Sequence, residues 1–435
     1  MANIYISFLG TNDYLSCTYH YKSRSPVEGI RFVQEATLST FCRDWSPEDR
    51  VVIFTTKDAY NKNWLDNGHV DHKTGDVIKC EGFKKRVDGL RLSPPVKNIE
   101  IPDGKSKQEL WEIFQKVFDC LKDQDEVVFD VTHAFRSIPI IAMVVISYAK
   151  VMKRVTLRGV YYGAFEALGT RREAEQLPPE KRIAPILDLT PLNELMEWSV
   201  AIDRFKESGD ASQVNMLARS GVESILRETK GRDDSAKVIK KIGGTLGAFS
   251  KTMATCRGQN ISKVARALKE EMDKCGNIEL VPAFVPLFDL IKKQMSGFGR
   301  DEITDGIEAA RWCFRHNLIQ QAYTILQETL ISYLVLQVKG DPEDVGKRNI
   351  ASQAVKIKSD SLPENKWNDP AGSDKEMTRQ FLKVLKNNVK LHRVLARLTE
   401  YRNDLNHAGH KDGAMDPSKF EGKMSEVLQV VEAHL

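Results

Sequence analysis

The strongest constraint on the fold is a change of pattern near residue 190 of this 435-residue chain. Before that point, short apolar runs alternate with helical stretches, and beyond it nearly every stretch has the period of a helix. A chain of this length also exceeds what one ordinary core can hold. We therefore predict an α/β domain at 1–190, a helical connector at 191–300 and an all-α domain at 301–435.

Several short apolar runs predict the strands of the first domain, at 4–9, 50–55, 126–132, 156–162 and 184–189. Strands that are apolar on both faces are typical of a parallel sheet covered by helices on both sides. Helical stretches at 106–121 and 138–152 lie between them. This alternation predicts a Rossmann-like, doubly wound sheet.

Helical periodicity continues to the C-terminus with polar breaks that carry glycine or proline. The predicted helices are 192–208, 211–228, 261–272, 283–295, 303–316, 318–338, 376–388, 391–403 and 417–434. The longest break, 359–374, is expected to be a mobile surface loop.

Composition constrains the location of the protein more than its partners. The 64 basic and 60 acidic residues leave a formal charge of +4, which neither requires nor excludes nucleic acid. Seven scattered cysteines without framework spacing indicate reduced thiols, and hence a cytoplasmic protein. The N-terminus lacks a basic leader, and the apolar run at 138–148 is too short to span a membrane.

Two loops after predicted strands have the chemistry to bind a phosphodiester. The first is Gly10-Thr11-Asn12, where a hydroxyl and an amide stand beside exposed backbone N–H groups. The second, between a strand and a helix, offers a helix N-terminus, a cation and hydroxyl donors. Its candidate ligand-binding residues are Thr132, His133, Arg136 and Ser137. Alternatively, Ser137 only caps its helix and His133 is an ordinary loop histidine.

The segment at 400–407, EYRNDLNH, has the residues needed for RNA cleavage without a metal. His407 could relay protons near neutral pH, and Arg402 could hold the scissile phosphate. Five residues along an ideal helix do not share one face, so His407 must lie where the helix ends. The same spacing recurs at Arg311 and His316, where apolar neighbours favour helix packing instead.

No other motif predicts a different chemistry. The pair His69 and His72 lies in a turn-rich stretch that favours an exposed loop over a metal site. The chain lacks a dinucleotide-binding glycine fingerprint, a Walker A motif, a nucleophile elbow and a zincin helix. We therefore predict neither a cofactor nor a metal.

The chain resembles the CARF–HEPN ribonucleases that accompany type III CRISPR systems. The resemblance rests on FLGTND after the first strand, DVTHAFRS at 130–137 and RNDLNH near the C-terminus. It extends to DLTPLNELMEWSVAIDRFKESGD at the junction and to WCFRHNLIQQAYTILQE, and so covers most of the chain in order. One position departs from the family's DxTHG signature, because Ala134 stands where the family has glycine, which puts the loop geometry and ligand preference in doubt.

The resemblance implies a protein that binds cyclic oligoadenylate in the first domain and cuts single-stranded RNA with the last. Arg402 and His407 then become the catalytic pair, with Asn403 in support. The two loops would bind the cyclic oligoadenylate, with tetra-adenylate favoured over hexa-adenylate. Family members act as homodimers, and a two-fold symmetric ligand suits a site shared by two copies.

Two other functions remain open. The sensor could also cleave its own cyclic ligand through Thr132, His133 or Arg136, as some CARF domains do. Alternatively, the chain is a nucleotide-sensing scaffold or regulator, in which RNDLNH is only a polar helix end. Convergence of Arg402 and His407 across a dimer would favour the nuclease over the scaffold.

Overall fold

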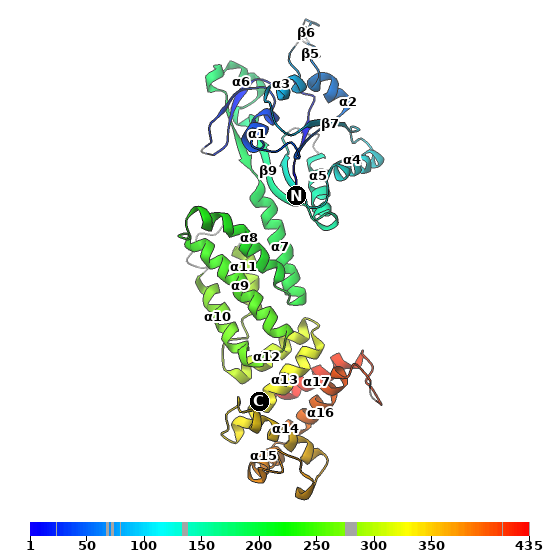
Figure 1. The fold of residues 1–435 in the computed structure, drawn as a ribbon, viewed down its shortest axis with the longest axis vertical. Helices are drawn as coiled ribbons and strands as arrows, with labels where there is room; N and C mark the ends of the chain where they lie inside the picture. The colour runs from blue at the N-terminus through cyan, green and yellow to red at the C-terminus, as the bar shows by residue number, and fades with distance from the viewer. Residues whose placement is uncertain are drawn as a thin grey trace. The chain divides into compact units, whose positions relative to one another are not determined.

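The computed structural model describes residues 1–435 except 23, 67–68, 71–73, 79, 133–137, 275–284, 411 and 435. The chain divides into two compact units, Met1–Glu194 and Leu195–Leu435. Figure 1 shows arrows in the first unit and coiled ribbons throughout the second. The predicted order, an α/β domain followed by a helical region, is confirmed.

The first unit is built on an eight-stranded sheet in the order β3-β2-β10-β9-β8-β1-β4-β7. Its strands are β1 (Asn3–Leu9), β2 (Cys17–His20), β3 (Val27–Ile30), β4 (Arg50–Thr55), β7 (Val96–Glu100), β8 (Glu126–Asp130), β9 (Thr156–Gly163) and β10 (Ile183–Asp188). The central strand β1 pairs in parallel with β4 and β8, and β7 and β9 continue the parallel sheet on either side. A separate small hairpin joins β5 (His69–Val70) to β6 (Val77–Ile78).

Helices cover both faces of this sheet. They are α1 (Val33–Phe41), α2 (Lys57–Ala59), η1 (Tyr60–Trp64), α3 (Phe83–Gly89), α4 (Lys107–Cys120), α5 (Ile138–Met152), η2 (Phe165–Leu168), α6 (Arg171–Gln176) and η3 (Pro179–Lys181). Side chains of β1 alternate between the faces, as in any strand. Ile4, Ile6 and Phe8 pack with α4 and α5, whereas Tyr5 and Leu9 pack with α1 and α3.

All five predicted strands are present, but the sheet is larger and less uniform than the sequence predicts. β10 runs antiparallel to β9, and β2 and β3 extend the sheet beyond it. The strands β2, β3 and β7 escape prediction because they are short and carry polar residues, so none forms a continuous apolar run.

The second unit is helical throughout the part that the structure describes, and α7 begins just before the boundary between the units. The helices are α7 (Thr190–Ser208), α8 (Ser212–Glu228), α9 (Asp234–Ala254), η4 (Gly258–Asn260), α10 (Ile261–Lys274), α11 (Val285–Gln294), α12 (Glu302–Arg315), α13 (Ile319–Gln337), α14 (Val345–Ser359), η7 (Glu364–Lys366), α15 (Lys375–Asn387), α16 (Val389–Asn406) and α17 (Lys419–Glu432). Trp312 of α12 and Tyr323 of α13 are fully buried at its core.

The sequence does not predict α9 or α14. Gly243, Gly244 and Gly247 weaken the helical signal of α9, since glycine is a poor helix former. The same residue type allows close packing: a Cβ atom added at Gly243 would lie 2.3 Å from the Cβ of Ala218 on α8. Tertiary packing therefore outweighs local propensity in α9.

The segment at 359–374 is anchored rather than loose, contrary to the prediction of a mobile loop. Gln353 of α14 donates a hydrogen bond to the Asp369 carbonyl at 2.9 Å. Its side-chain oxygen accepts one from the Ala371 backbone at 2.9 Å, and Ala371 is fully buried. These contacts join the segment to the helical core.

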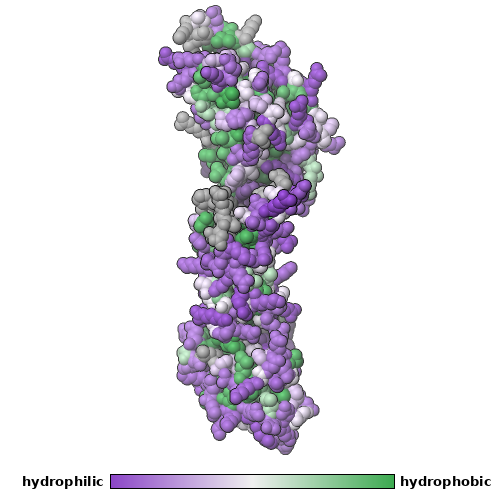
Figure 2. All heavy atoms as spheres, turned by 90° about the vertical axis from the view of Figure 1, so that its left-hand side faces the viewer, coloured by the Kyte–Doolittle hydropathy of each residue, from purple (hydrophilic) through white to green (hydrophobic). Residues whose placement is uncertain are grey.

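The face drawn in Figure 2 is mostly hydrophilic, with hydrophobic atoms gathered in small separate patches. Among the described helices, none has both the length and the apolar character needed to cross a membrane.

Candidate functional site

The first helices after β1 and β8 in the chain, α1 and α5, lie on opposite faces of the sheet. Ser7 of β1 stands opposite Asp130 of β8 in parallel register. The helix after β8, α5, packs on one face, whereas α1, between β1 and β4, packs on the other. The carboxyl ends of strands that diverge in this way are where open α/β sheets bind ligands. Gly10 and Thr132, from the two predicted ligand loops, directly flank this point.

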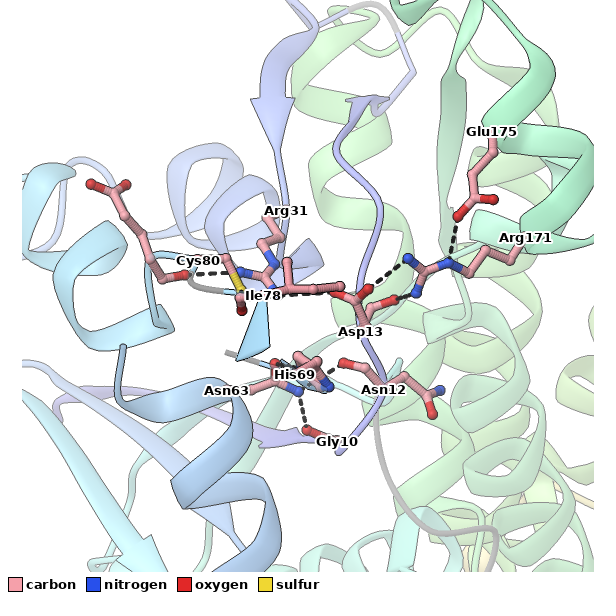
Figure 3. A network of polar contacts seen from close by, with 11 residues as sticks. Gly10, Asn12, Asp13, Arg31, Asn63, His69, Ile78, Cys80, Arg171 and Glu175 are labelled. Atoms are coloured by element: carbon pink, nitrogen blue, oxygen red, sulfur yellow. Dashed lines mark hydrogen bonds and ion pairs between the residues drawn. The ribbon is translucent and has the colours of Figure 1, made fainter. Parts of the chain in front are cut away.

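The loop after β1 is fixed by a buried amide from another element. Asn63 of the π-helix η1 is fully buried, and its Nδ2 donates to the carbonyls of Gly10 and Asn12 at 2.8 and 2.9 Å (Figure 3). The Asn12 side chain itself is exposed, and Thr11 is half-buried. Asn63 therefore sets the backbone of the loop and leaves the Asn12 side chain available to a ligand.

His69 completes this arrangement from the β5–β6 hairpin. Its Nε2 lies 2.9 Å from Asn63 Oδ1. Because the Asn63 NH₂ group is used by two carbonyls, Oδ1 must accept, so Nε2 of His69 carries the proton. Burial lowers the pKa of His69, which favours this neutral form. His69 is thus a support of the β1 loop, while His72, its partner in the disfavoured metal pair, lies outside the described residues.

A pocket of about 380 Å³ opens beside the same loop, and Asp13 lies in its wall between two arginines. Asp13 accepts from Arg31 at 3.2 Å and from Arg171 at 2.6 Å (Figure 3). Arg31 is 8% exposed, and Arg171 also bonds Glu175 at 2.8 Å. The two guanidinium groups suit phosphate, but each is already paired with a carboxylate, so an anionic ligand must compete with Asp13.

Thr132 is held by a buried hydrogen-bond network at the end of β8. Its hydroxyl donates to Asp130 at 2.6 Å and accepts from the Gly163 backbone N–H at 2.8 Å. Asp130 is fully buried and also accepts from Tyr5 at 2.9 Å and Thr37 at 2.8 Å. Burial raises the pKa of Asp130, and these donors oppose that shift. Because the Thr132 hydroxyl already donates to Asp130 and accepts from Gly163, its role is to position the loop and not to donate a hydrogen bond to a ligand.

The remaining predicted ligand residues, His133, Arg136 and Ser137, lie outside the described residues, as does Ala134.

In the second unit, the predicted catalytic residues lie where α16 ends. His407 is the C-cap of α16, followed by Ala408 and Gly409 with positive φ angles of 52° and 74°. The helix therefore ends at His407, and Asn403 and His407 are both exposed. This geometry meets the requirement that five-residue spacing imposes on Arg402 and His407.

Arg402 is only 30% exposed, because α13 covers part of it. Its guanidinium lies 3.5 Å from Glu328 of α13, and Glu328 also pairs with Arg348 of α14 at 2.6 Å. Below the motif, buried Asp404 accepts from the Met415 backbone at 2.8 Å and ties down the turn. Arg402 Nε is buried and makes no hydrogen bond, so the guanidinium is only partly accessible at the end of α16.

The second arginine–histidine pair has the packing role that the sequence favours. Arg311 is paired with Glu308 and with Glu432. His316 is 6% exposed and its Nδ1 lies 2.7 Å from the Trp312 carbonyl. Burial lowers the pKa of His316. His316 is thus part of the helical core, and Arg311 is held in two ion pairs beside it.

The fold is that of a Rossmann-like α/β domain joined to a helical unit. Residues 4–166 match the family described as "CRISPR system endoribonuclease Csx1, CARF domain". The chain is also 24% identical over 428 residues to CRISPR-associated protein MJ1674 of Methanocaldococcus jannaschii, across 89% of this chain. The alignment covers 62% of that relative, so this chain spans less than two thirds of it. The N-terminal domain is therefore similar to a CARF domain of a CRISPR-associated protein, and the similarity to a CRISPR-associated protein extends over most of the chain.

Proposed function

We propose that this chain is a ribonuclease activated by cyclic oligoadenylate, with the activator bound by the CARF domain. In this proposal residues 301–435 form a HEPN-like domain that cuts single-stranded RNA. The observation that carries the proposal is the position of Arg402, Asn403 and His407 at a helix end, with Asn403 and His407 exposed. A metal-free nuclease needs these groups accessible to RNA, whereas a purely structural helix end does not.

The activator would bind at the carboxyl ends of β1 and β8. Gly10, Thr11 and Asn12 supply a loop with a fixed backbone, and Thr132 positions the other wall. His133, Arg136 and Ser137 would add the cationic and hydroxyl groups. We expect tetra-adenylate to activate better than hexa-adenylate.

A homodimer would bring two such activator-binding ends together. Helix α5, which begins after residue 137, exposes apolar side chains at helical spacing: Ile140 is 67% exposed, Val144 55% and Val151 79%. An apolar stripe of this kind is a candidate subunit contact. A two-fold axis near α5 would place both activator loops around one symmetric ligand.

The proposed chemistry needs no metal. His407 would take the proton of the 2′-hydroxyl as its oxygen attacks the adjacent phosphorus. The P–O5′ bond breaks, and the leaving 5′-oxygen takes a proton from the protonated imidazole of His407, which gives a 2′,3′-cyclic phosphate and a 5′-hydroxyl and returns His407 to its neutral form. Arg402 would stabilise the charge that develops on the phosphoryl oxygens.

Activation would depend on a difference in binding between two arrangements of the dimer. Cyclic oligoadenylate must bind one arrangement better, and that arrangement must bring the two motifs together. The helices of residues 191–300 would connect sensor and nuclease.

The first test follows cleavage of a fluorescent single-stranded RNA by the purified chain in EDTA. Reactions contain no activator, cyclic tetra-adenylate or cyclic hexa-adenylate. We expect activator-dependent cleavage that His407→Ala abolishes and His410→Ala, an exposed neighbour, retains. Equal cleavage by His407→Ala would overturn the catalytic assignment. Absence of cleavage with either activator would favour the scaffold, and loss of the cyclic ligand during incubation would favour self-limiting cleavage.

A further inference from the structure

A groove of about 690 Å³ runs between α14 and α16 in the second unit. Buried Val355 and half-buried Ala396 form part of its lining, and most of the remainder is polar. The groove also includes Asn403, next to the proposed catalytic Arg402. It therefore reaches the end of α16 where cleavage is proposed to occur.

Three exposed cations line this α14–α16 groove: Lys356, Arg393 and Arg397. Within the described part of the chain, the ion pairs involve none of the three, although Asp360 and Glu400 also line the groove. Arg393 and Arg397 are four residues apart on one helix, a spacing at which like charges repel. Elsewhere this chain pairs lysines with acids at that spacing, as in Lys62–Asp58 and Lys116–Glu112. The groove thus keeps a positive charge that the local sequence does not neutralise.

The lining residues of α16 follow one face of the helix toward the catalytic end. Val389, Arg393, Ala396, Glu400 and Asn403 are spaced three or four residues apart. His407, four residues beyond Asn403, is the next position of this series. The distance from Arg393 to His407 along the helix axis is about 21 Å, at roughly 1.5 Å per residue.

We propose that the α14–α16 groove binds the sugar-phosphate backbone of single-stranded RNA and leads it to the motif at the end of α16. The proposal rests on the proposed ribonuclease function and adds the path of the substrate. Positive charge along a groove is the general device for holding a single strand regardless of sequence. Polar groups of Ser359 and His392, which lie 3.1 Å apart in the groove wall, could contact riboses or bases.

A second copy of the chain fits this groove less well than RNA. A two-fold contact centred on the groove would place the same surface on both sides. Arg393 and Arg397 would then face an equally positive surface, at an electrostatic cost. An RNA backbone instead supplies the missing negative charge.

The test measures RNA binding separately from cleavage. A labelled single-stranded RNA is titrated by fluorescence anisotropy with full-length His407→Ala, with and without cyclic tetra-adenylate, across a series of salt concentrations. The groove variant adds Arg393→Gln and Arg397→Gln. The matched control adds Lys383→Gln and Lys386→Gln, which remove two exposed charges from α15 outside the groove. A charge-conserving variant, Arg393→Lys with Arg397→Lys, controls for loss of packing.

We expect the groove variant to lose about tenfold in RNA affinity at low salt and its salt slope to fall by about 1.4, or 0.7 for each lost phosphate contact. The control should bind like the parent, and the lysine variant should retain most of the affinity. Unchanged affinity and slope in the groove variant would overturn the RNA path. An altered oligomeric state with unchanged RNA binding would also overturn it, and would assign the groove to a contact between copies.

The outcomes separate this inference from the proposed function. If the wild-type chain cuts RNA but the groove variant binds and cuts with unchanged KM, only the groove assignment fails. If RNA binds in the groove but activated wild-type protein never cuts it, the ribonuclease proposal fails while the groove assignment stands.

Discussion

The guanidinium of Arg402 lies 3.5 Å from the carboxylate of Glu328, which is also bound by Arg348 at 2.6 Å. One acidic side chain on α13 therefore neutralises part of the charge that the proposed cleavage needs. An RNA phosphate that reaches Arg402 must compete with Glu328 for it. The Arg402–Glu328 ion pair therefore lowers the net positive charge at the motif before RNA binds.

Replacing Glu328 with glutamine should strengthen binding of RNA. The substitution keeps the size of the side chain but removes the charge that competes with phosphate for Arg402. Half-exposed ion pairs contribute about 1 kcal/mol or less, so we expect KM for RNA to fall by about two- to fivefold with little change in kcat. Steady-state cleavage with saturating activator measures both constants. Glu432→Gln, which removes one of the two carboxylate partners of Arg311, is the matched control and should leave both unchanged. A loss of kcat above tenfold would instead mean that Glu328 positions Arg402 for catalysis.

Removing the amide of Asn63 should weaken binding of the activator. Asn63→Ala leaves the carbonyls of Gly10 and Asn12 and the Nε2 proton of His69 without their present partner. Loss of such buried hydrogen bonds costs about 1–3 kcal/mol in stability and frees the loop after β1. We expect Kd for cyclic oligoadenylate to rise about tenfold or more, measured by calorimetry. Asn61→Ala changes an exposed neighbour and should bind like the wild type. If Asn63→Ala keeps full affinity, the loop after β1 does not contact the activator.

The hydroxyl of Thr132 should stabilise the folded chain through its two hydrogen bonds. Thr132→Val keeps the shape but removes the donor to Asp130 and the acceptor for the Gly163 N–H. We expect a loss of about 1–3 kcal/mol in the free energy of unfolding, measured by urea denaturation followed by circular dichroism. Thr132→Ser restores both hydrogen bonds and should recover most of it. A valine variant as stable as the wild type, but unable to bind cyclic oligoadenylate, would show that the hydroxyl serves the ligand directly.

The sequence predicts the parallel centre of the sheet because β1, β4 and β8 are continuous apolar runs. It misses β2 and β3, whose alternating exposure carries a weaker signal, and α9, whose glycines contradict local propensity but permit close packing with α8. The order of an α/β region and a helical region follows directly from hydrophobic periodicity.

The sequence predicts a candidate site only where several reactive or ligand-binding residues lie close together along the chain. Gly10 to Asn12 and Arg402 to His407 are short segments whose residues suggest a role together. Asn63, Arg31 and Arg171 come from separate elements and converge only in the folded sheet. No local pattern marks them, because the groups that join them to the loop after β1 are the distant carbonyls of Gly10 and Asn12 and the carboxylate of Asp13.

The free energy of unfolding should depend on pH partly through His69. Its pKa is lowered in the folded chain, first because burial disfavours the charged ring. The unfolded chain therefore binds more protons at His69 than the folded chain does at pH values near and below the ordinary histidine pKa of about 6.5. Stability from this residue is present above that range and is lost as the pH falls through it.

The measurement is urea denaturation of the full chain between pH 5 and 8, compared with His69→Gln. Glutamine can still donate an N–H to Asn63 but does not titrate, so the wild type should lose more stability than the variant on acidification. His434→Gln, at an exposed histidine near the C-terminus, should follow the wild type at every pH. Equal pH dependence in wild type and His69→Gln would mean that His69 titrates alike in both states. That result would contradict the inference that a neutral His69, protonated on Nε2, holds Asn63 and the loop after β1.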